Sequence, residues 1–175
     1  VWRDGKRLRS AFYEGPLVVL VDRLSASASE IFAGAIQDYQ RGIVVGDQSF
    51  GKGTVQTLVP LTEGQLKITE SKFYRISGES TQHRGVVPDI IFPSIYDPEE
   101  IGESALDHAL SWDKINAVKH RVYDDLSTSL PTITRLFKAR SVSNPEYIYL
   151  EDQVGLANEA RAVTELPLNE KHRIA

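Results

Sequence analysis

Three serines and one lysine are the residues of this sequence whose types and positions best suit chemistry. Ser25, Ser27 and Ser29 stand where a helix is expected to begin, and Lys52 lies between two glycines after an apolar stretch. A serine hydroxyl is a weak nucleophile until a neighbouring base takes its proton. A lysine amine that is desolvated by burial can become neutral and act as that base. These residues predict a serine/lysine hydrolase site.

The expected helix start also suits the binding of an oxyanion. The first amides of a helix have no intrahelical partner and lie at the positive end of its dipole. The backbone N–H of Ala28 is therefore a candidate donor to the charged oxygen of an acyl-transfer intermediate. The same place has a structural interpretation, because Ser27-Ala28-Ser29-Glu30 matches a capping box. These four residues alone favour a cap, and the lysine is what favours catalysis.

Histidine offers a second route to a base, but its positions support it poorly. Three of the four histidines lie beyond residue 95, and His83 lies in the polar loop Thr81-Gln82-His83-Arg84, which is typical of a solvated side chain. A Ser-His-Asp triad is possible on these residues but weak. Lys52 fits the role better, because the glycines at positions 51 and 53 let other backbone segments approach its loop closely.

A phosphate-binding loop is the competing interpretation of the same lysine. Gly46 to Lys52 satisfies the pattern Gly-x-x-x-x-Gly-Lys. The next residue should be serine or threonine, to hold magnesium, but it is Gly53. Such a loop should also open a helix, whereas residues 54–59 have the composition of a strand. The nucleotide-binding alternative is therefore disfavoured.

The elements around these residues predict an α/β fold. Residues 16–21 and 43–45 are continuously apolar, as in strands buried on both faces. Between them, residues 28–39 place apolar side chains at helical spacing, which predicts one buried helix face made of Ala28, Ile31, Phe32, Ala35 and Tyr39. A strand-helix-strand unit favours a parallel pair of strands. Residues 47–53 follow it as a loop.

Further strands complete the predicted mixed sheet. Residues 54–61 and 65–76 indicate two strands, the second with the alternation of a sheet that has one solvated face. Residues 86–93 indicate a short edge strand bracketed by prolines. Asp4-Gly5, near the start of the chain, is a hairpin turn dipeptide.

Beyond Pro93 the strand signals end and a helical extension is expected. Helical candidates lie at 103–110, 131–140 and 145–163, with Pro131 and Pro145 placed as helix starts. We therefore predict two domains, a catalytic core over residues 1–95 and a mostly helical C-terminal extension over residues 96–175.

Composition excludes several classes of function. A net charge of -4 shows no basic excess for nucleic-acid binding. The absence of cysteine excludes disulfides and zinc-thiolate sites, and no apolar run approaches the roughly 20 residues of a membrane-spanning helix. We expect no metal and no cofactor. The chain also lacks methionine, which predicts that it is a fragment of a longer protein, with any signal peptide lying outside it.

Three ordered motifs carry a resemblance to a known family: Ser25–Glu30, Phe50–Gln56, and Ser80–Gln82 with Gly85–Asp89. Together they resemble the C-terminal processing proteases, and among these the bacterial tail-specific proteases. The resemblance covers residues 12–95 and extends more loosely into the C-terminal part, including residues 109–113. It implies that residues 1–95 are the C-terminal part of a serine/lysine protease core.

The resemblance also implies roles for individual residues. In that family the catalytic serine and lysine stand 25 positions apart, which selects Ser27 as the partner of Lys52. Gln56 matches a glutamine that assists the lysine, and Asp38 matches an aspartate implicated in activity. Eleven helical residues return Asp38 to the face of Ser27 but roughly 16 Å further along the axis. We therefore expect a structural or indirect role for Asp38.

The implied activity is metal-free hydrolysis of peptide bonds through an acyl-enzyme. The implied substrates are proteins recognised at nonpolar C-terminal tails, with an adaptor protein as a possible partner, and the implied location is the bacterial periplasm. The family's second oxyanion donor and its PDZ-like domain precede the nucleophile strand and are not in this chain. The alternative is a non-catalytic structural or partner-binding module, in which the serine cluster only caps a helix.

Overall fold

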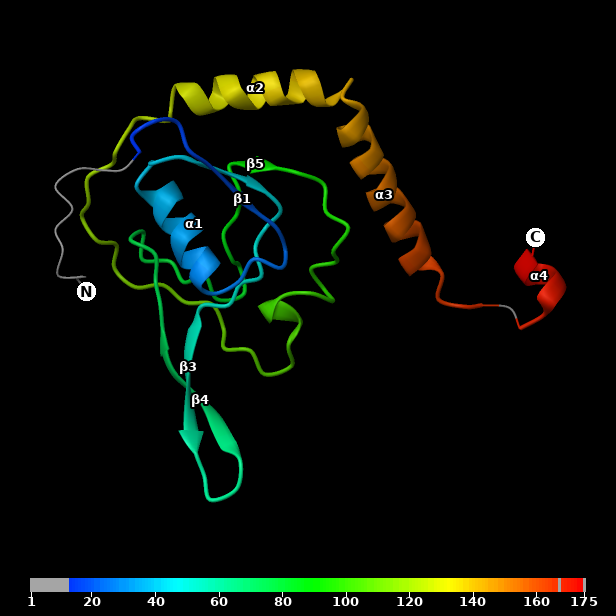
Figure 1. Cartoon of the computed structure of the whole chain (residues 1–175), viewed down its shortest axis with the longest axis horizontal. Coiled ribbons are helices and arrows are strands. Elements are labelled where there is room, and N and C mark those ends of the chain that lie inside the picture. Colours follow the sequence, from blue (N-terminus) through cyan, green and yellow to red (C-terminus); the bar gives the residue numbers. More distant parts are fainter. Residues whose placement is uncertain (1–12, 167, 175) are drawn as a thin grey trace.

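The computed structural model describes residues 13–166 and 168–174, and it confirms the α/β class (Figure 1). Asp4-Gly5 lies outside the described residues. In chain order the elements are β1 (Val18–Val21), α1 (Ala28–Asp38), β2 (Ile43–Gly46), β3 (Thr54–Pro60), β4 (Gln65–Lys72), β5 (Ile90–Ile91), the 3-10 turn η1 (Glu103–Ala105), α2 (Ser129–Ser141), α3 (Pro145–Ala162) and α4 (Glu170–Ile174).

A three-stranded parallel sheet in the order β1-β2-β5 forms the centre of the body. Val18 pairs with Ile43 and Val45 pairs with Ile90. The predicted strand-helix-strand unit and its parallel pair are therefore confirmed, and β5 is the predicted edge strand. It is only two residues long, because proline, which lacks a backbone N–H, cannot donate to the ladder. The antiparallel strands β3 and β4 form a separate sheet.

Two apolar clusters make the core. The first holds Val21, Ala33, Val44 and Val86, with Val44 fully buried. The second joins the sheet to the helical part of the chain and consists of Ile43, Val45 and Ile90, with Phe92, Leu126, Leu130 and Phe137 packed against them. Strand β2 is buried as predicted. The burial predicted for both faces of β1 is wrong, because Val18 and Leu20, which share one face of the strand, are 53% and 76% exposed.

Helix α1 covers the sheet with a face other than the predicted one. Ala33 and Gly34 are buried together with Glu30, whereas Phe32 is 56% exposed and Ile31 is exposed as well. Small side chains let the helix approach the sheet closely, and the buried carboxylate of Glu30 serves neighbouring loops. The helical spacing was correct, but periodicity alone selected the wrong apolar face.

Strands β3 and β4 form an antiparallel ribbon that projects from the body (Figure 1). Beyond Thr54 every residue of the ribbon up to Ser71 is exposed, so the prediction of one buried face is not met in this structure. A bulge between Val55 and Gln56 interrupts the register near the root of the ribbon. Bulges bend and twist a strand locally, and this one lies shortly after Lys52 in the chain.

The C-terminal part contains the predicted helices with shifted bounds. Helix α2 begins two residues before Pro131, and Asn144 caps α3 by accepting from the amides of Glu146 and Tyr147. The helix predicted at 103–110 is only the short turn η1. No helix in residues 13–166 and 168–174 is long and apolar enough to cross a bilayer.

Candidate active site

Ser27 lies at a strained turn where β1 leads into α1. Its backbone adopts φ 58 and ψ -111, and the Ser29 N–H donates to the Ala26 carbonyl at 3.2 Å. These values match the first central position of a type II′ turn, which glycine usually occupies. Such backbone strain costs about 1–3 kcal/mol and clusters at functional sites. An ordinary N-cap serine adopts the extended region instead.

The two neighbouring serines are placed differently from Ser27. The Ser25 hydroxyl donates to the Asp22 carboxylate at 3.0 Å, and the same oxygen accepts from the Asp22 N–H at 3.1 Å. Ser25 therefore stabilises the turn after β1. Ser29 lies exposed within the first turn of α1.

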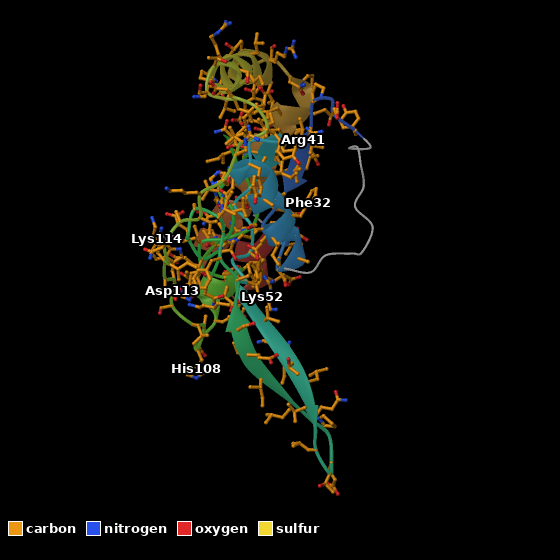
Figure 2. The ribbon with its side chains drawn as sticks, turned by 90° about the vertical axis from the view of Figure 1, so that its left-hand side faces the viewer. Phe32, Arg41, Lys52, His108, Asp113 and Lys114 are labelled. Carbon is orange, nitrogen blue, oxygen red and sulfur yellow. The ribbon has the colours of Figure 1, made fainter. Side chains whose placement is uncertain are left out.

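Lys52 occupies a tightly packed loop at the root of the β3–β4 ribbon (Figure 2). Its side chain is half-buried and both flanking glycines are buried. Gly51 has φ +94, and a Cβ there would lie 2.7 Å from the His83 carbonyl oxygen. A Cβ on Gly53 would lie 2.6 Å from the backbone nitrogen of Gln82. The loop leads into strand β3, so the helix that a phosphate-binding loop requires is absent here.

Glu30 connects the serine turn to the lysine loop. It is fully buried. Its Oε1 accepts from the Ser49 hydroxyl at 2.6 Å and from the Gly51 N–H at 2.7 Å. Its Oε2 accepts from the Ser27 N–H at 2.8 Å and from the Lys52 N–H at 2.9 Å. Four donors thus compensate the burial of this carboxylate.

The shared Oε2 atom sets an upper limit on the separation of the two candidate residues. The backbone nitrogens of Ser27 and Lys52 are at most 5.7 Å apart, which is the sum of the 2.8 and 2.9 Å distances to that oxygen. The Phe50 N–H also donates to the Ser25 carbonyl at 2.9 Å. The serine turn and the lysine loop are therefore neighbours, although 25 positions separate Ser27 from Lys52 in the sequence.

Comparison with known proteins identifies the family of this chain. A family model described as peptidase family S41 matches residues 3–92. The chain belongs to peptidase family S41. A second model, described as the C-terminal domain of tail specific protease, matches residues 96–175 of this S41 chain.

Individual S41 relatives extend the match. The chain is 42% identical to a tail-specific protease of Haemophilus influenzae, over 93% of this chain and 25% of that protein. It is 49% identical to a carboxy-terminal-processing protease of Bartonella bacilliformis, over 52% of this chain and 21% of that protein. A solved photosystem II D1 C-terminal processing protease is 44% identical with a TM-score of 0.41, over 48% of this chain and 21% of that one. The chain thus spans about a quarter or less of these relatives.

Two further candidate residues flank the pair in the sequence: Ala28 follows Ser27 directly, and Gln56 lies four residues after Lys52. Ala28 is the first residue of α1, so its amide lacks an intrahelical acceptor. Gln56 lies on exposed β3, and its amide donates to the Thr69 hydroxyl at a long 3.5 Å. No hydrogen bond between Gln56 and Lys52 is present among the described residues.

Asp38 lies at the far end of α1, away from Ser27. It forms a bidentate ion pair with Arg75, whose Nε donates to Oδ2 at 3.0 Å and whose Nη2 donates to Oδ1. Arg75 also donates to the Gln37 side chain at 2.8 Å. This pair ties the end of α1 to the segment that follows β4, and the structural or indirect role expected for Asp38 remains a prediction.

His83 packs against the lysine loop through its backbone. Its N–H donates to the Gly51 carbonyl at 2.9 Å, and its own φ is 64. Its ring Nε2 is buried and has no hydrogen-bond partner among the described residues. The polar sequence around His83 predicted a solvated side chain, but the loop that carries His83 folds back over residues 51–53.

Sequence reasoning gave Glu30 only a capping role. The predicted contact with the Ser27 amide exists, yet the other three donors to this carboxylate come from residues 49–52. An acidic residue three positions after the cap was the available signal, but its burial was not readable from periodicity.

The residues that the structure describes contain no group of three or more potential metal ligands.

Proposed function

We propose that the protein containing this chain is a serine endopeptidase of the tail-specific type, with Ser27 as nucleophile and Lys52 as general base. The observation that supports this most directly is that one oxygen of Glu30 accepts hydrogen bonds from the backbone N–H groups of both Ser27 and Lys52. This contact holds the two residues as neighbours, and the strained backbone of Ser27 distinguishes it from Ser25 and Ser29. Membership of peptidase family S41 agrees with the assignment.

The proposed reaction starts with the neutral amine of Lys52. The amine takes the proton of the Ser27 hydroxyl while Oγ attacks the carbonyl carbon of the scissile bond. The Ala28 N–H donates to the resulting oxyanion. The lysine ammonium then protonates the leaving amine as the C–N bond breaks, which leaves an acyl-enzyme. A water molecule, deprotonated by Lys52, hydrolyses the ester and restores the serine.

Gln56 and Glu30 would support Lys52 in different ways. Gln56 lies four residues after the lysine, at the start of β3, and we assign it to orienting the amine once substrate is bound. Catalytic hydrogen bonds are often long in unliganded proteins and tighten with substrate. Glu30 would act as a positioning residue through the backbone of both loops.

We also propose a substrate class, proteins with nonpolar C-terminal tails. The names of several relatives, which are called tail-specific or C-terminal-processing proteases, support recognition of a C-terminal tail, and its nonpolar character is the finer part of the proposal. An adaptor protein as partner and a periplasmic location belong to the same proposal. The division into a catalytic core over residues 1–95 and a helical extension over residues 96–175 also remains a proposal.

Mutation of the two catalytic candidates tests the proposal in the whole protein. With a protein ending in a nonpolar tail, Ser27→Ala and Lys52→Ala should each lower kcat by at least about 1000-fold. The matched controls Ser29→Ala and Lys67→Ala change an exposed serine of α1 and an exposed lysine of β4 and should stay within about threefold of the unmodified rate.

The same experiment separates the non-catalytic alternative. The Glu30–Ser27 contact is what a helix cap would form, so a structural module also accounts for it. Near-normal cleavage by Ser27→Ala or Lys52→Ala would reject the dyad and favour that module.

A further inference from the structure

Residues that take no part in the proposed reaction also hold the lysine loop in place. Glu103, in η1, is only 8% exposed. Its N–H donates to the Phe50 carbonyl at 2.9 Å. Its carboxylate Oε1 accepts from the Gln82 side-chain amide at 2.9 Å. Glu103 lies in the part of the chain that matches the C-terminal domain of tail specific protease. A residue of that part therefore contacts the lysine loop directly.

Gln82 connects Glu103 to the residue after Lys52. It is fully buried. Its Oε1 accepts from the Gly53 N–H at 2.9 Å while its Nε2 donates to Glu103. The backbone of Gly53 also approaches the backbone of Gln82 so closely that a Cβ on Gly53 would lie 2.6 Å from the backbone nitrogen of Gln82. One buried side chain therefore sets the position of the peptide that follows the lysine.

The carboxylate at position 103 fixes which way the Gln82 amide faces. A carboxylate has only acceptors, so it selects the amide nitrogen of Gln82 and turns the amide oxygen towards Gly53. Without that acceptor, the amide would leave a buried donor unpaired or rotate and present a donor to the Gly53 N–H. Either change removes the support of the loop.

Arg23 provides a second link between the same segments. It is 3% exposed, and its guanidinium donates to the Ser49 carbonyl at 3.0 Å and to the Ile101 carbonyl at 2.6 Å. A Cβ on Gly102 would lie 2.4 Å from Arg23 Nη2. The segment around residues 101–103 is thus packed against the lysine loop at two points.

We propose that Glu103 is a positioning residue for Lys52, acting through Gln82 and the Gly53 amide. The C-terminal segment then completes the catalytic loop. This inference rests on the proposed function, in which Lys52 must hold a neutral amine beside Ser27. If residues 51–53 loosen, the Lys52 amine is no longer held beside the Ser27 hydroxyl, and proton transfer between them slows.

Kinetics of Glu103 variants in the whole protein test the proposal. Glu103→Ala should lower kcat at least tenfold with KM unchanged within twofold, because the loop positions the general base and is not assigned to substrate binding. Glu103→Gln should keep at least half of kcat, because its side-chain oxygen still accepts from Gln82. The control Glu100→Ala, an exposed residue of the same segment, should change nothing. An unchanged kcat in Glu103→Ala would overturn the proposal.

An exchange of the two side chains guards against misfolding of the alanine variant. Gln82→Glu sets two buried carboxylates against each other and should lower kcat at least tenfold. The double variant Gln82→Glu/Glu103→Gln rebuilds the contact with the roles reversed, and it should recover kcat to within about threefold of the unmodified protein. A double variant no better than Gln82→Glu alone would contradict the relay.

Hydrogen exchange separates this inference from the dyad itself. In Glu103→Ala, amide exchange in residues 49–56 should become at least tenfold faster, with no such change in Glu100→Ala. This measurement needs no catalysis. If Ser27→Ala cleaved normally while exchange accelerated, the proposed function would fail and the link between Glu103 and the loop would stand. Unchanged exchange together with inactive Ser27→Ala would remove the relay and leave the dyad.

Discussion

At the scale of single residues, Glu30 explains how a serine and a lysine that are distant in sequence become neighbours. Its two oxygens accept four hydrogen bonds, from the backbone of Ser27, Gly51 and Lys52 and from the Ser49 hydroxyl. The Ser49 oxygen in turn accepts from the Val86 N–H at 2.7 Å. The network is buried, and a partly satisfied buried network is costly.

Glu30→Gln should therefore harm both folding and catalysis. An amide nitrogen in place of one carboxylate oxygen would face two of the four donors, which removes two acceptor contacts and should lower the free energy of unfolding by about 2–4 kcal/mol. We also expect kcat to fall at least tenfold. Denaturant titration and cleavage assays measure the two effects, with the exposed Glu99→Gln as control. Full stability and activity in Glu30→Gln would show that the carboxylate is not required.

At the scale of elements, the Asp38–Arg75 pair joins the end of α1 to the segment after β4. Both side chains are largely buried, and removal of one partner would leave the other charge unpaired. Asp38→Asn and Arg75→Ala should each lower the free energy of unfolding by about 2–4 kcal/mol. The double variant should lose clearly less than the sum of the two single losses. Simple additivity in denaturant titrations would reject the coupling.

The root of the β3–β4 ribbon carries a pH-dependent contact. The Lys72 ammonium and the Tyr74 hydroxyl donate to Asp113 at 2.9 Å each, and these bonds hold the pKa of Asp113 below its ordinary value of 3.8. A carboxyl whose pKa is lowered by folding stabilises the protein above its unfolded pKa, and that stabilisation is lost as the pH falls below it.

Asp113→Asn should therefore change the pH dependence of stability. Unfolding free energies of the two proteins should differ by a constant amount above about pH 5 and converge as the pH falls towards 2. The pKa of Tyr74 is raised, mainly by its hydrogen bond to Asp113, so stability from this contact should also decline as the pH rises through 10. A gap independent of pH would show that Asp113 does not titrate differently on folding.

At the scale of the molecule, the C-terminal part packs on the core. Leu126, Leu130 and Phe137 contact the second apolar cluster, and Arg23 holds the Ile101 carbonyl. A chain ended after residue 95 should therefore unfold at least about 5 °C lower than one ended after residue 164, in thermal melts followed by circular dichroism. Equal midpoints would show that residues 1–95 fold as an independent domain.

Local patterns predicted the elements well because strand, helix and loop follow from short stretches of sequence. Residues 16–46 form the expected parallel unit, and the loop with Lys52 lies where expected. The exposed Phe32 and Leu20 were predicted wrongly, since burial depends on which segments pack on an element. Glu103 was missed for the same reason: its contact with Gln82 spans 21 positions and leaves no periodic signal.

Covalent trapping is the sharpest test of the Ser27–Lys52 dyad. The whole protein would be mixed with an activated peptide ester, quenched in acid and mapped by mass spectrometry, because rapid acylation makes the intermediate accumulate. We expect one acyl group on the peptide that contains Ser27, located on that residue by fragmentation and absent in Ser27→Ala and Lys52→Ala. An acyl group on Ser25 or Ser29, or equal labelling of Ser27→Ala, would contradict it.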